Sequence, residues 1–192
     1  AGVRFRTVHP VLNKINATAG LNAAASSAGE DARETAPRPF MIDVTLSSPC
    51  EIAPADWRAL CARAEANVFM DPAALAAAAA ERFAEPCVLA AWDVNKDSRR
   101  LVGLWALNRH RPLPLFPKLL EGLPFYYAFN ATPVIEPQCA HDVSEAFLAT
   151  IMRDRNLPKV ISVKSLDLES VAGAAIMDAV SRHGRHAILH QS

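Results

Sequence analysis

The sequence has little of what metal sites and cofactor sites are usually built from. Its four cysteines form no Cys-x-x-Cys pair and no cysteine–histidine cluster with zinc-finger spacing. Glycine is scarce, with seven residues in 192, and none lies between Gly122 and Gly173. No catalytic triad, phosphate-binding loop or dinucleotide fingerprint can be recognised. The sequence therefore offers no catalytic motif of its own, and we predict no metal site.

Charge and hydropathy exclude two further classes. The 20 Lys and Arg residues balance 20 Asp and Glu residues, which gives a formal net charge of zero. There is thus no general attraction to nucleic acid or to an anionic membrane, although a local basic patch is compatible with this balance. No apolar run approaches the roughly 20 residues of a membrane span. With cysteines that we expect to be reduced, we predict a cytoplasmic protein that binds no nucleic acid.

The first 40 residues differ in composition from the rest. Residues 1–29 contain no acidic residue, and Ala, Ser, Asn, Thr and Gly dominate residues 17–29. Such a composition buries little surface, so we predict a disordered extension over residues 1–40. It resembles an organelle transit peptide superficially, but it lacks a clear arginine-rich amphipathic face. The folded part is expected over residues 41–192.

The folded part is predicted to begin with a strand and two helices. Residues 41–46 alternate apolar and polar side chains, which is typical of a strand. Pro54 opens a helix, because its missing N–H costs nothing there, and Trp57 and Leu60 begin its buried stripe. The pair Asp71-Pro72, a capping residue followed by proline, predicts the start of a second helix.

A hairpin and a proline-rich segment are expected next. Residues 87–94 and 101–108 read as strands joined by the turn-rich residues 95–98, which predicts an antiparallel hairpin. Residues 109–124 hold four prolines among Leu and Phe, a density that predicts a long loop without strand or helix. The aromatic-rich residues 125–130 then predict another strand.

The remaining residues predict two helix–strand units. A helix is expected from Asp142, with Glu145 completing a capping box, and a strand over residues 159–166. Asp167 is predicted to cap the next helix, whose apolar stripe begins at Leu168 and Val171, and Gly184 to end it before a strand at 185–191. The order β-α-α-β-β-β-α-β-α-β predicts an α/β fold with a mixed sheet and helices on both faces.

That order resembles the GNAT acetyltransferase fold, and five strings of sequence sharpen the resemblance. They are similar to the N-terminal half of the CelD/BcsL group of acyltransferases, which are FemAB-like chains with two GNAT-type domains, associated with cellulose and exopolysaccharide biosynthesis. The strings are WRAL at 57–60, EANVFMDP at 65–72, LVGLWAL at 101–107, TPVI at 132–135 and LPKV at 157–160. The resemblance implies a fragment of a longer transferase, with a C-terminal GNAT-like domain and a small-molecule or saccharide acceptor as partners.

Residues 131–142 depart from the family pattern. A catalytic GNAT domain binds the diphosphate of acetyl-CoA with consecutive backbone N–H groups of a glycine-rich loop before a helix. Here the loop reads ATPVIEPQCAHD, without glycine, and Pro133 and Pro137 remove two donors. We therefore expect no cofactor to bind this domain. Acetyl-CoA or another acyl-CoA would be bound by the second domain.

Four residues are candidates for substrate binding, each with a simpler structural interpretation. Tyr126 and Tyr127 are adjacent on a predicted strand, so one would belong to the core and the other could line a cleft. Lys164 lies in a predicted strand, where it would contact substrate or extend from an edge into solvent. His141, at a helix start, would be a catalytic base or a solvated histidine. No catalytic residue is assigned.

The proline-rich segment suggests an alternative function. Its large apolar side chains would form an exposed patch unless the domain's own core or a partner covers them. The segment at 112–124 is thus expected to contact the missing second domain, to fold back, or to dock a non-enzymatic interaction domain on a partner protein. The side chains concerned are Leu113, Leu115, Phe116, Leu119 and Leu120.

Overall fold

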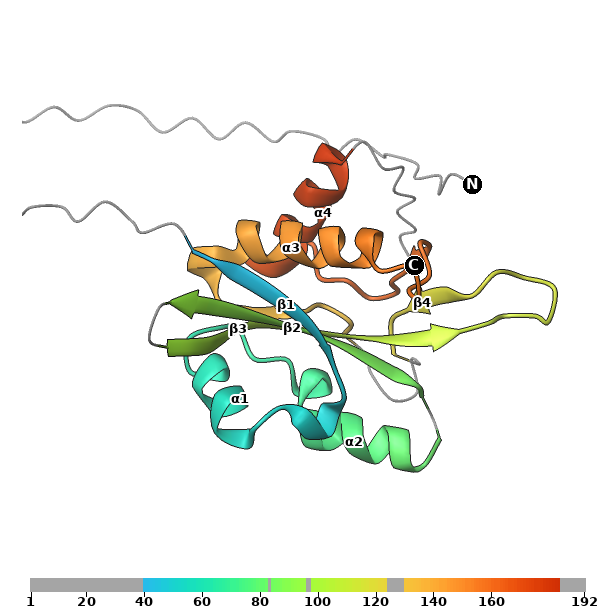
Figure 1. The fold of residues 1–192 in the computed structure, drawn as a ribbon, viewed down its shortest axis with the longest axis horizontal. Coiled ribbons are helices and arrows are strands. Elements are labelled where there is room, and N and C mark those ends of the chain that lie inside the picture. Colours follow the sequence, from blue (N-terminus) through green and yellow to red (C-terminus); the bar gives the residue numbers. More distant parts are fainter. Residues whose placement is uncertain (1–39, 83, 96–97, 124–129, 184–192) are drawn as a thin grey trace, which may run out of the picture.

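The computed structural model describes residues 40–82, 84–95, 98–123 and 130–183 (Figure 1). The strands in chain order are β1 (Ile42–Ser47), β2 (Pro86–Asn95), β3 (Ser98–His110), β4 (Leu119–Glu121), β5 (Val134–Ile135) and β6 (Ile161–Ser162). The α-helices are α1 (Pro54–Cys61), α2 (Pro72–Ala80), α3 (Ala140–Arg153) and α4 (Val171–Arg182). Three short 3-10 helices are η1 (Pro49–Glu51), η2 (Val68–Met70) and η3 (Pro137–Cys139).

The strands form one mixed, mostly antiparallel sheet. Their order is β1-β2-β3-β4-β6, and β5 pairs with β3 beside this path. The pair β4–β6 is parallel, and the other described pairs are antiparallel. The predicted hairpin is confirmed as β2–β3, with a register shift between Ala91 and Trp92 that is typical of a bulge.

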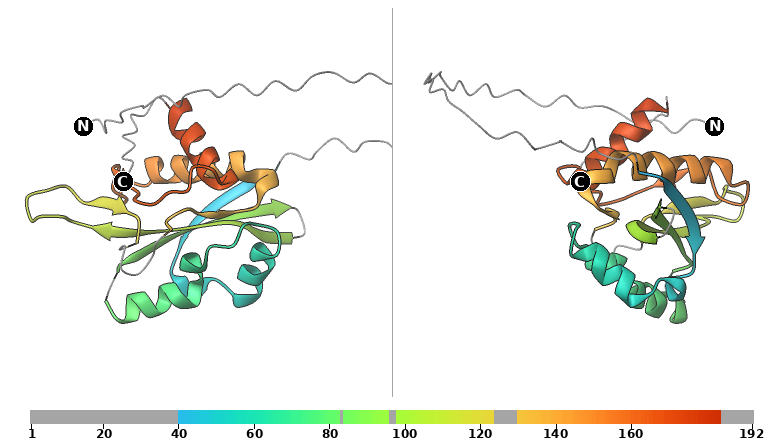
Figure 2. Two further views of the ribbon diagram at one scale, coloured as in Figure 1. Left: turned by 180° about the vertical axis from the view of Figure 1, so that it is seen from behind. Right: turned by 60° about the vertical axis from the view of Figure 1, so that its left-hand side comes forward.

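Helices cover both faces of the sheet, as predicted. Helices α1 and α2 lie on one side, and α3 and α4 on the other (Figures 1 and 2). Because both faces are covered, the central strands are buried almost continuously, from Cys87 to Ala91 in β2 and from Leu101 to Leu107 in β3. The core of the domain therefore lies around the β2–β3 hairpin.

Gly103 sets how closely α3 approaches the sheet. A Cβ atom at this position would lie 2.6 Å from Cγ1 of Val143 and 3.3 Å from Cζ of Phe147, both on α3. Nearby, the rings of Trp105 and Phe147 pack with their centroids 6.0 Å apart. The missing side chain of Gly103 thus allows α3 to pack directly on β3.

The prediction that residues 109–124 lack regular structure is wrong in part. Strand β3 continues to His110, and β4 pairs antiparallel with its end and parallel with β6. The prolines of the segment lie outside β4, so the N–H groups in and directly after this strand can form hydrogen bonds. Leu120 N donates to Val160 O at 2.8 Å, and Gly122 N, just after β4, donates to Ser162 O at 2.9 Å.

Both C-terminal helices begin at residues other than the predicted caps. Helix α3 continues directly from η3, so Asp142 lies within its first turn and does not cap it. Helix α4 begins after Ser170, whose Oγ accepts from Gly173 N at 3.0 Å, while Oδ1 of Asp167 accepts from Glu169 N in the preceding turn. Leu168 and Val171, predicted as core, are consequently exposed.

The strand predicted at 159–166 is shortened to β6. The strand ends at Ser162, and the chain bends at Lys164 and Ser165, where the φ of 60° at Ser165 is left-handed. Phe40, assigned to the N-terminal extension, packs against the core. Residues 1–39, most of the strand predicted at 125–130, Gly184 and the strand predicted at 185–191 lie outside the described residues. Among the described helices, none combines the length and apolar character needed to cross a membrane.

We predict that Gly103→Ala destabilises the domain by about 1–3 kcal/mol, because the added methyl group overpacks the contact with α3. Urea unfolding followed by circular dichroism measures the change. Gly122→Ala is the matched control: its added Cβ meets one close atom, Cβ of Ala131 at 3.1 Å, so we expect a smaller loss. Equal stabilities for the Gly103 variant and wild type would contradict the close packing.

Candidate functional site

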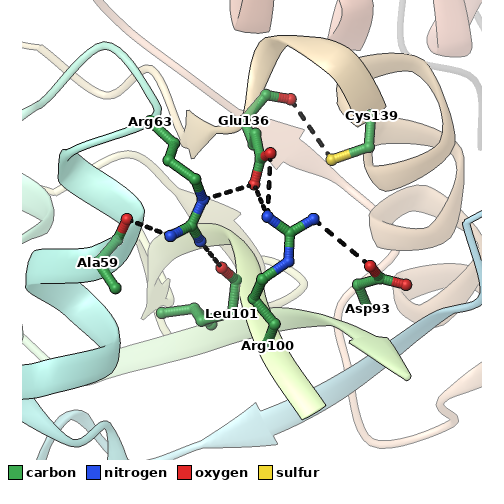
Figure 3. A network of polar contacts seen from close by, with 7 residues as sticks. All are labelled: Ala59, Arg63, Asp93, Arg100, Leu101, Glu136 and Cys139. Carbon is green, nitrogen blue, oxygen red and sulfur yellow. Dashed lines mark hydrogen bonds and ion pairs between the residues drawn. The ribbon is translucent and has the colours of Figure 1, made fainter. Parts of the chain in front are cut away.

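A partly buried ion cluster links α1, the β2–β3 hairpin and the segment after β5 (Figure 3). Glu136, which follows β5, is 4% exposed, and its carboxylate lies between two guanidinium groups. Arg63 Nε donates to Oε2 of Glu136 at 3.0 Å, and Arg100 Nη1 donates to Oε1 and Oε2 at 3.1 and 2.9 Å. Arg100 Nη2 also donates to Oδ2 of Asp93 at 3.4 Å, so two positive charges face two negative charges.

The cluster connects four separate parts of the chain. Arg63, after α1, also donates to the carbonyl oxygens of Ala59 and Leu101, at 2.5 and 3.0 Å. Arg100 lies directly opposite Asp93 across the β2–β3 hairpin. Burial by itself would lower the pKa of Arg100, but its hydrogen bonds with the two carboxylates, and their charges, raise this pKa above its ordinary value. The cluster therefore places the guanidinium of Arg100 in direct contact with both carboxylates.

Residues 131–139, the first part of the stretch 131–142 considered from the sequence for a coenzyme diphosphate, brace the sheet. Ala131 to Glu136 are buried, and β5 pairs with Gly103 and Leu104 of β3. Four backbone N–H groups of this stretch donate within the domain: Ala131 N to Ser165 O, Thr132 N to Oδ1 of Asn130, Glu136 N to Val102 O, and Cys139 N to Glu136 O. Their distances are 2.9–3.1 Å. These donors are used for folding.

A small cavity lies beside this stretch, at the start of α4. It measures about 60 Å³, well below the ~300–1,000 Å³ typical of small-molecule sites. Its polar groups bind each other: Nδ2 of Asn67 donates to the carbonyl oxygens of Asn130 and Thr132, and Oγ1 of Thr132 accepts from Asp167 N. The cavity is thus lined by groups that already have partners.

The residues of the EANVFMDP string hold the fold together. Asn67 forms the bonds just described, and the sulfur of Met70 accepts from Ala106 N at 3.4 Å. Asp71 caps α2 through Oδ1, which accepts from Ala73 N at 2.8 Å, as predicted. Its Oδ2 accepts from Nε1 of Trp57 at 3.0 Å, which ties α1 to α2. These contacts give the string a structural explanation.

The four predicted substrate-binding residues do not form one described site. His141 is exposed at the start of α3, and its ring nitrogens lie 2.6 Å from the guanidinium of Arg182 on α4. Lys164 lies beyond the end of β6 and pairs with Glu121 of β4 at 3.4 Å, which corrects its predicted place within a strand. Tyr126 and Tyr127 lie outside the described residues.

Buried thiols are held in the unreactive form. Burial and the charge of Glu136 raise the pKa of Cys139 to about 12, and its Sγ contacts Glu136 O at 3.4 Å. Burial also raises the pKa of the buried Cys87 and of the half-buried Cys61. Cys50 is exposed. Because the thiolate is the nucleophile, Cys139 is a structural residue at neutral pH. In the described part of the chain, His, Cys, Asp and Glu form no group of three or more suited to a metal ion.

Comparisons of the chain with protein-family models, curated proteins and solved structures give no match.

We predict that Glu136→Gln lowers the free energy of unfolding by about 2–3 kcal/mol, because two guanidinium groups lose their shared carboxylate. The loss stays below that of a fully buried pair, since both arginines reach solvent. Chemical denaturation measures it. Asp43→Asn is the control: its carboxylate is exposed and lies 4.0 Å from Arg99, so less than about 0.5 kcal/mol is expected. Similar losses for both variants would show that burial of the cluster adds nothing.

We predict that iodoacetamide labels Cys50 in the folded protein at about pH 8, near the ordinary pKa of a free thiol. Cys87 and Cys139 should react only after unfolding, because burial excludes the reagent and raises their pKa values. Peptide mass spectrometry with and without denaturant distinguishes the sites. Rapid labelling of Cys139 in the native protein would contradict the structural role given to it.

Proposed function

We propose that this domain is the non-cofactor-binding half of a GNAT/FemAB-like acyltransferase. The proposal starts from the five strings of sequence and from a mixed sheet with helices on both faces. One observation supports the view that this half does not bind the cofactor. Four backbone N–H groups of residues 131–139 donate hydrogen bonds within the domain, and Ala131 to Glu136 are buried. A coenzyme diphosphate needs such donors unpaired, so acetyl-CoA or another acyl-CoA would be bound by a C-terminal GNAT-like domain.

The reaction proposed is direct acyl transfer. An amine or hydroxyl of the acceptor attacks the thioester carbonyl, a general base takes its proton, and the coenzyme leaves as the thiol or thiolate. The acceptor would be a small molecule or a saccharide, in keeping with the resemblance to proteins of cellulose and exopolysaccharide biosynthesis. We assign no step to a residue of this chain. Its contribution would be a rigid wall that helps to orient the acceptor.

A second candidate function is docking without chemistry. It is favoured by one observation: of the apolar side chains at 112–124, Leu120 is buried in the sheet, but Leu113, Leu115 and Phe116 remain exposed. The prediction that this segment folds back onto the core is therefore confirmed for Leu120 but not for Leu113, Leu115 and Phe116. The exposed part keeps the properties of an interaction surface.

We predict that isothermal titration calorimetry with acetyl-CoA gives no micromolar binding to this chain. The encoding DNA should continue in frame into a second α/β domain with a glycine-bearing coenzyme loop, and the two-domain protein should bind acetyl-CoA. A micromolar dissociation constant for this chain alone would contradict the interpretation of residues 131–142. A reading frame without the second domain would exclude the two-domain proposal and leave docking.

A further inference from the structure

A two-stranded arm projects from the body of the domain. Strand β3 stays paired with β2 as far as Asn108, and then pairs with β4 through Arg109–Leu120 and His110–Leu119. Residues 109–120, which we call the arm, extend beyond the helices (Figure 1, and Figure 2, left). The arm is anchored at its base, because Leu120 is fully buried and β4 also pairs with β6.

The outer end of the arm is a tight turn with an apolar surface. Phe116 N donates to Leu113 O at 2.9 Å, which closes a four-residue turn with Pro114 in its second position, where proline fits turn geometry. Leu115, at the corner of the turn, is 98% exposed, and Leu113 and Phe116 are 56% and 55% exposed. Three large apolar side chains thus form a convex tip, which we call the apolar tip.

The apolar tip is held in place before it binds anything. Pro112, Pro114 and Pro117 fix three backbone φ angles around the turn. Arg111 Nη1 donates to Pro114 O at 3.3 Å, which adds a side-chain brace within the arm. Little conformational entropy would be lost on binding, and this lowers the cost of association.

Basic residues surround the apolar tip on both strands. The sequence of residues 109–118 is RHRPLPLFPK, with three Arg or Lys, one His and no carboxylate. Arg111 precedes the tip and Lys118 follows it, and both are exposed. The next carboxylate in β4, Glu121, pairs with Lys164. The arm is therefore positively charged, although the chain as a whole is neutral.

We propose that the arm docks this domain on a membrane surface that contains anionic lipids. Leu113, Leu115 and Phe116 would enter the boundary of the acyl chains, and Arg111 and Lys118 would contact headgroup phosphates. The apolar tip lies at the outer end of the arm and the basic residues lie behind it. In the same way, the acyl chains of a bilayer lie deeper than its headgroup phosphates. A convex tip suits a lipid surface, whereas a protein partner would need a concave apolar pocket with an acidic rim.

The inference depends on the arm as a docking surface and not on the acyltransferase proposal. The two can therefore fail separately: acetyl-CoA titration tests the second, and lipid binding tests the first. The apolar tip contributes through burial of apolar surface and Lys118 through charge, whereas Arg111 contributes charge and also braces the tip. Each contribution can be removed by exposed substitutions that leave the core intact.

The test is flotation of the full chain with phosphatidylcholine vesicles, with and without about one third phosphatidylserine. We expect the chain to float with the anionic vesicles and to bind the neutral ones far less. The double variant Leu115→Ser/Phe116→Ser should lower partitioning by about tenfold or more, because apolar burial is lost. Arg111→Glu/Lys118→Glu should lower it similarly, because favourable charge is replaced by repulsion.

The matched control is Leu168→Ser/Val171→Ser, which removes two apolar side chains that are 42% and 54% exposed at the start of α4. It should float as wild type does. Circular dichroism melting of every variant verifies folding. As a direct readout, Leu115→Trp should be quenched by brominated lipid in anionic vesicles, and Val171→Trp should not.

Three results would overturn the inference. The first is absence of flotation by the wild-type chain, and the second is unchanged flotation of the Leu115→Ser/Phe116→Ser variant, which would place the lipid contact elsewhere. The third is self-association in light scattering that these two serines abolish while lipid binding stays absent. That result would assign the arm to a protein contact, and docking would survive without the lipid.

Discussion

The domain depends on one buried carboxylate, that of Glu136, which lies between the guanidinium groups of Arg63 and Arg100. A buried charge without partners would be costly, so these three side chains must come together as the chain folds. In doing so they fix the end of α1, the β2–β3 hairpin and the entry to η3 and α3 in one arrangement. The cluster thus adds to the core packing that holds the two helical layers on the sheet.

This constraint also explains why residues 131–139, which the resemblance to GNAT domains matches to a coenzyme-binding loop, form a short strand and a 3-10 helix instead. The stretch must deliver Glu136 to the arginines, and it does so as a short strand on β3. Its backbone groups are used in the process. Likewise, Asn67, Met70 and Asp71 of the EANVFMDP string bind backbone and side-chain groups of the fold. The EANVFMDP string, which resembles an acyltransferase family, is thus accounted for by structural contacts, and the function proposed from the resemblance stays a proposal.

The sequence predicts the long elements well because their periodicity is local. The alternation at residues 41–46, the helix that Pro54 opens and the helix that Asp71 caps all have counterparts in the structure. Strands β4 and β5 have three and two residues, too few to show alternation. The pairings of β5 with β3 and of β4 with β6 join segments distant in the sequence, although β4 also pairs with β3 across the adjacent turn. The ion cluster was also missed, because its members lie far apart in the sequence. One signal was present, since Asp93 and Glu136 are carboxylates within apolar stretches.

The parallel pair of β4 and β6 has a consequence for folding order. Leu120 pairs with Ile161, and the whole of α3 lies between them in the chain. Such distant pairing is slow to form, because the intervening chain must be ordered first. On an emerging polypeptide, the β3–β4 hairpin can therefore form by local pairing before the segment after α3 has left the ribosome. Its base gains the parallel partner β6 only afterwards, so the projection is built early and anchored late.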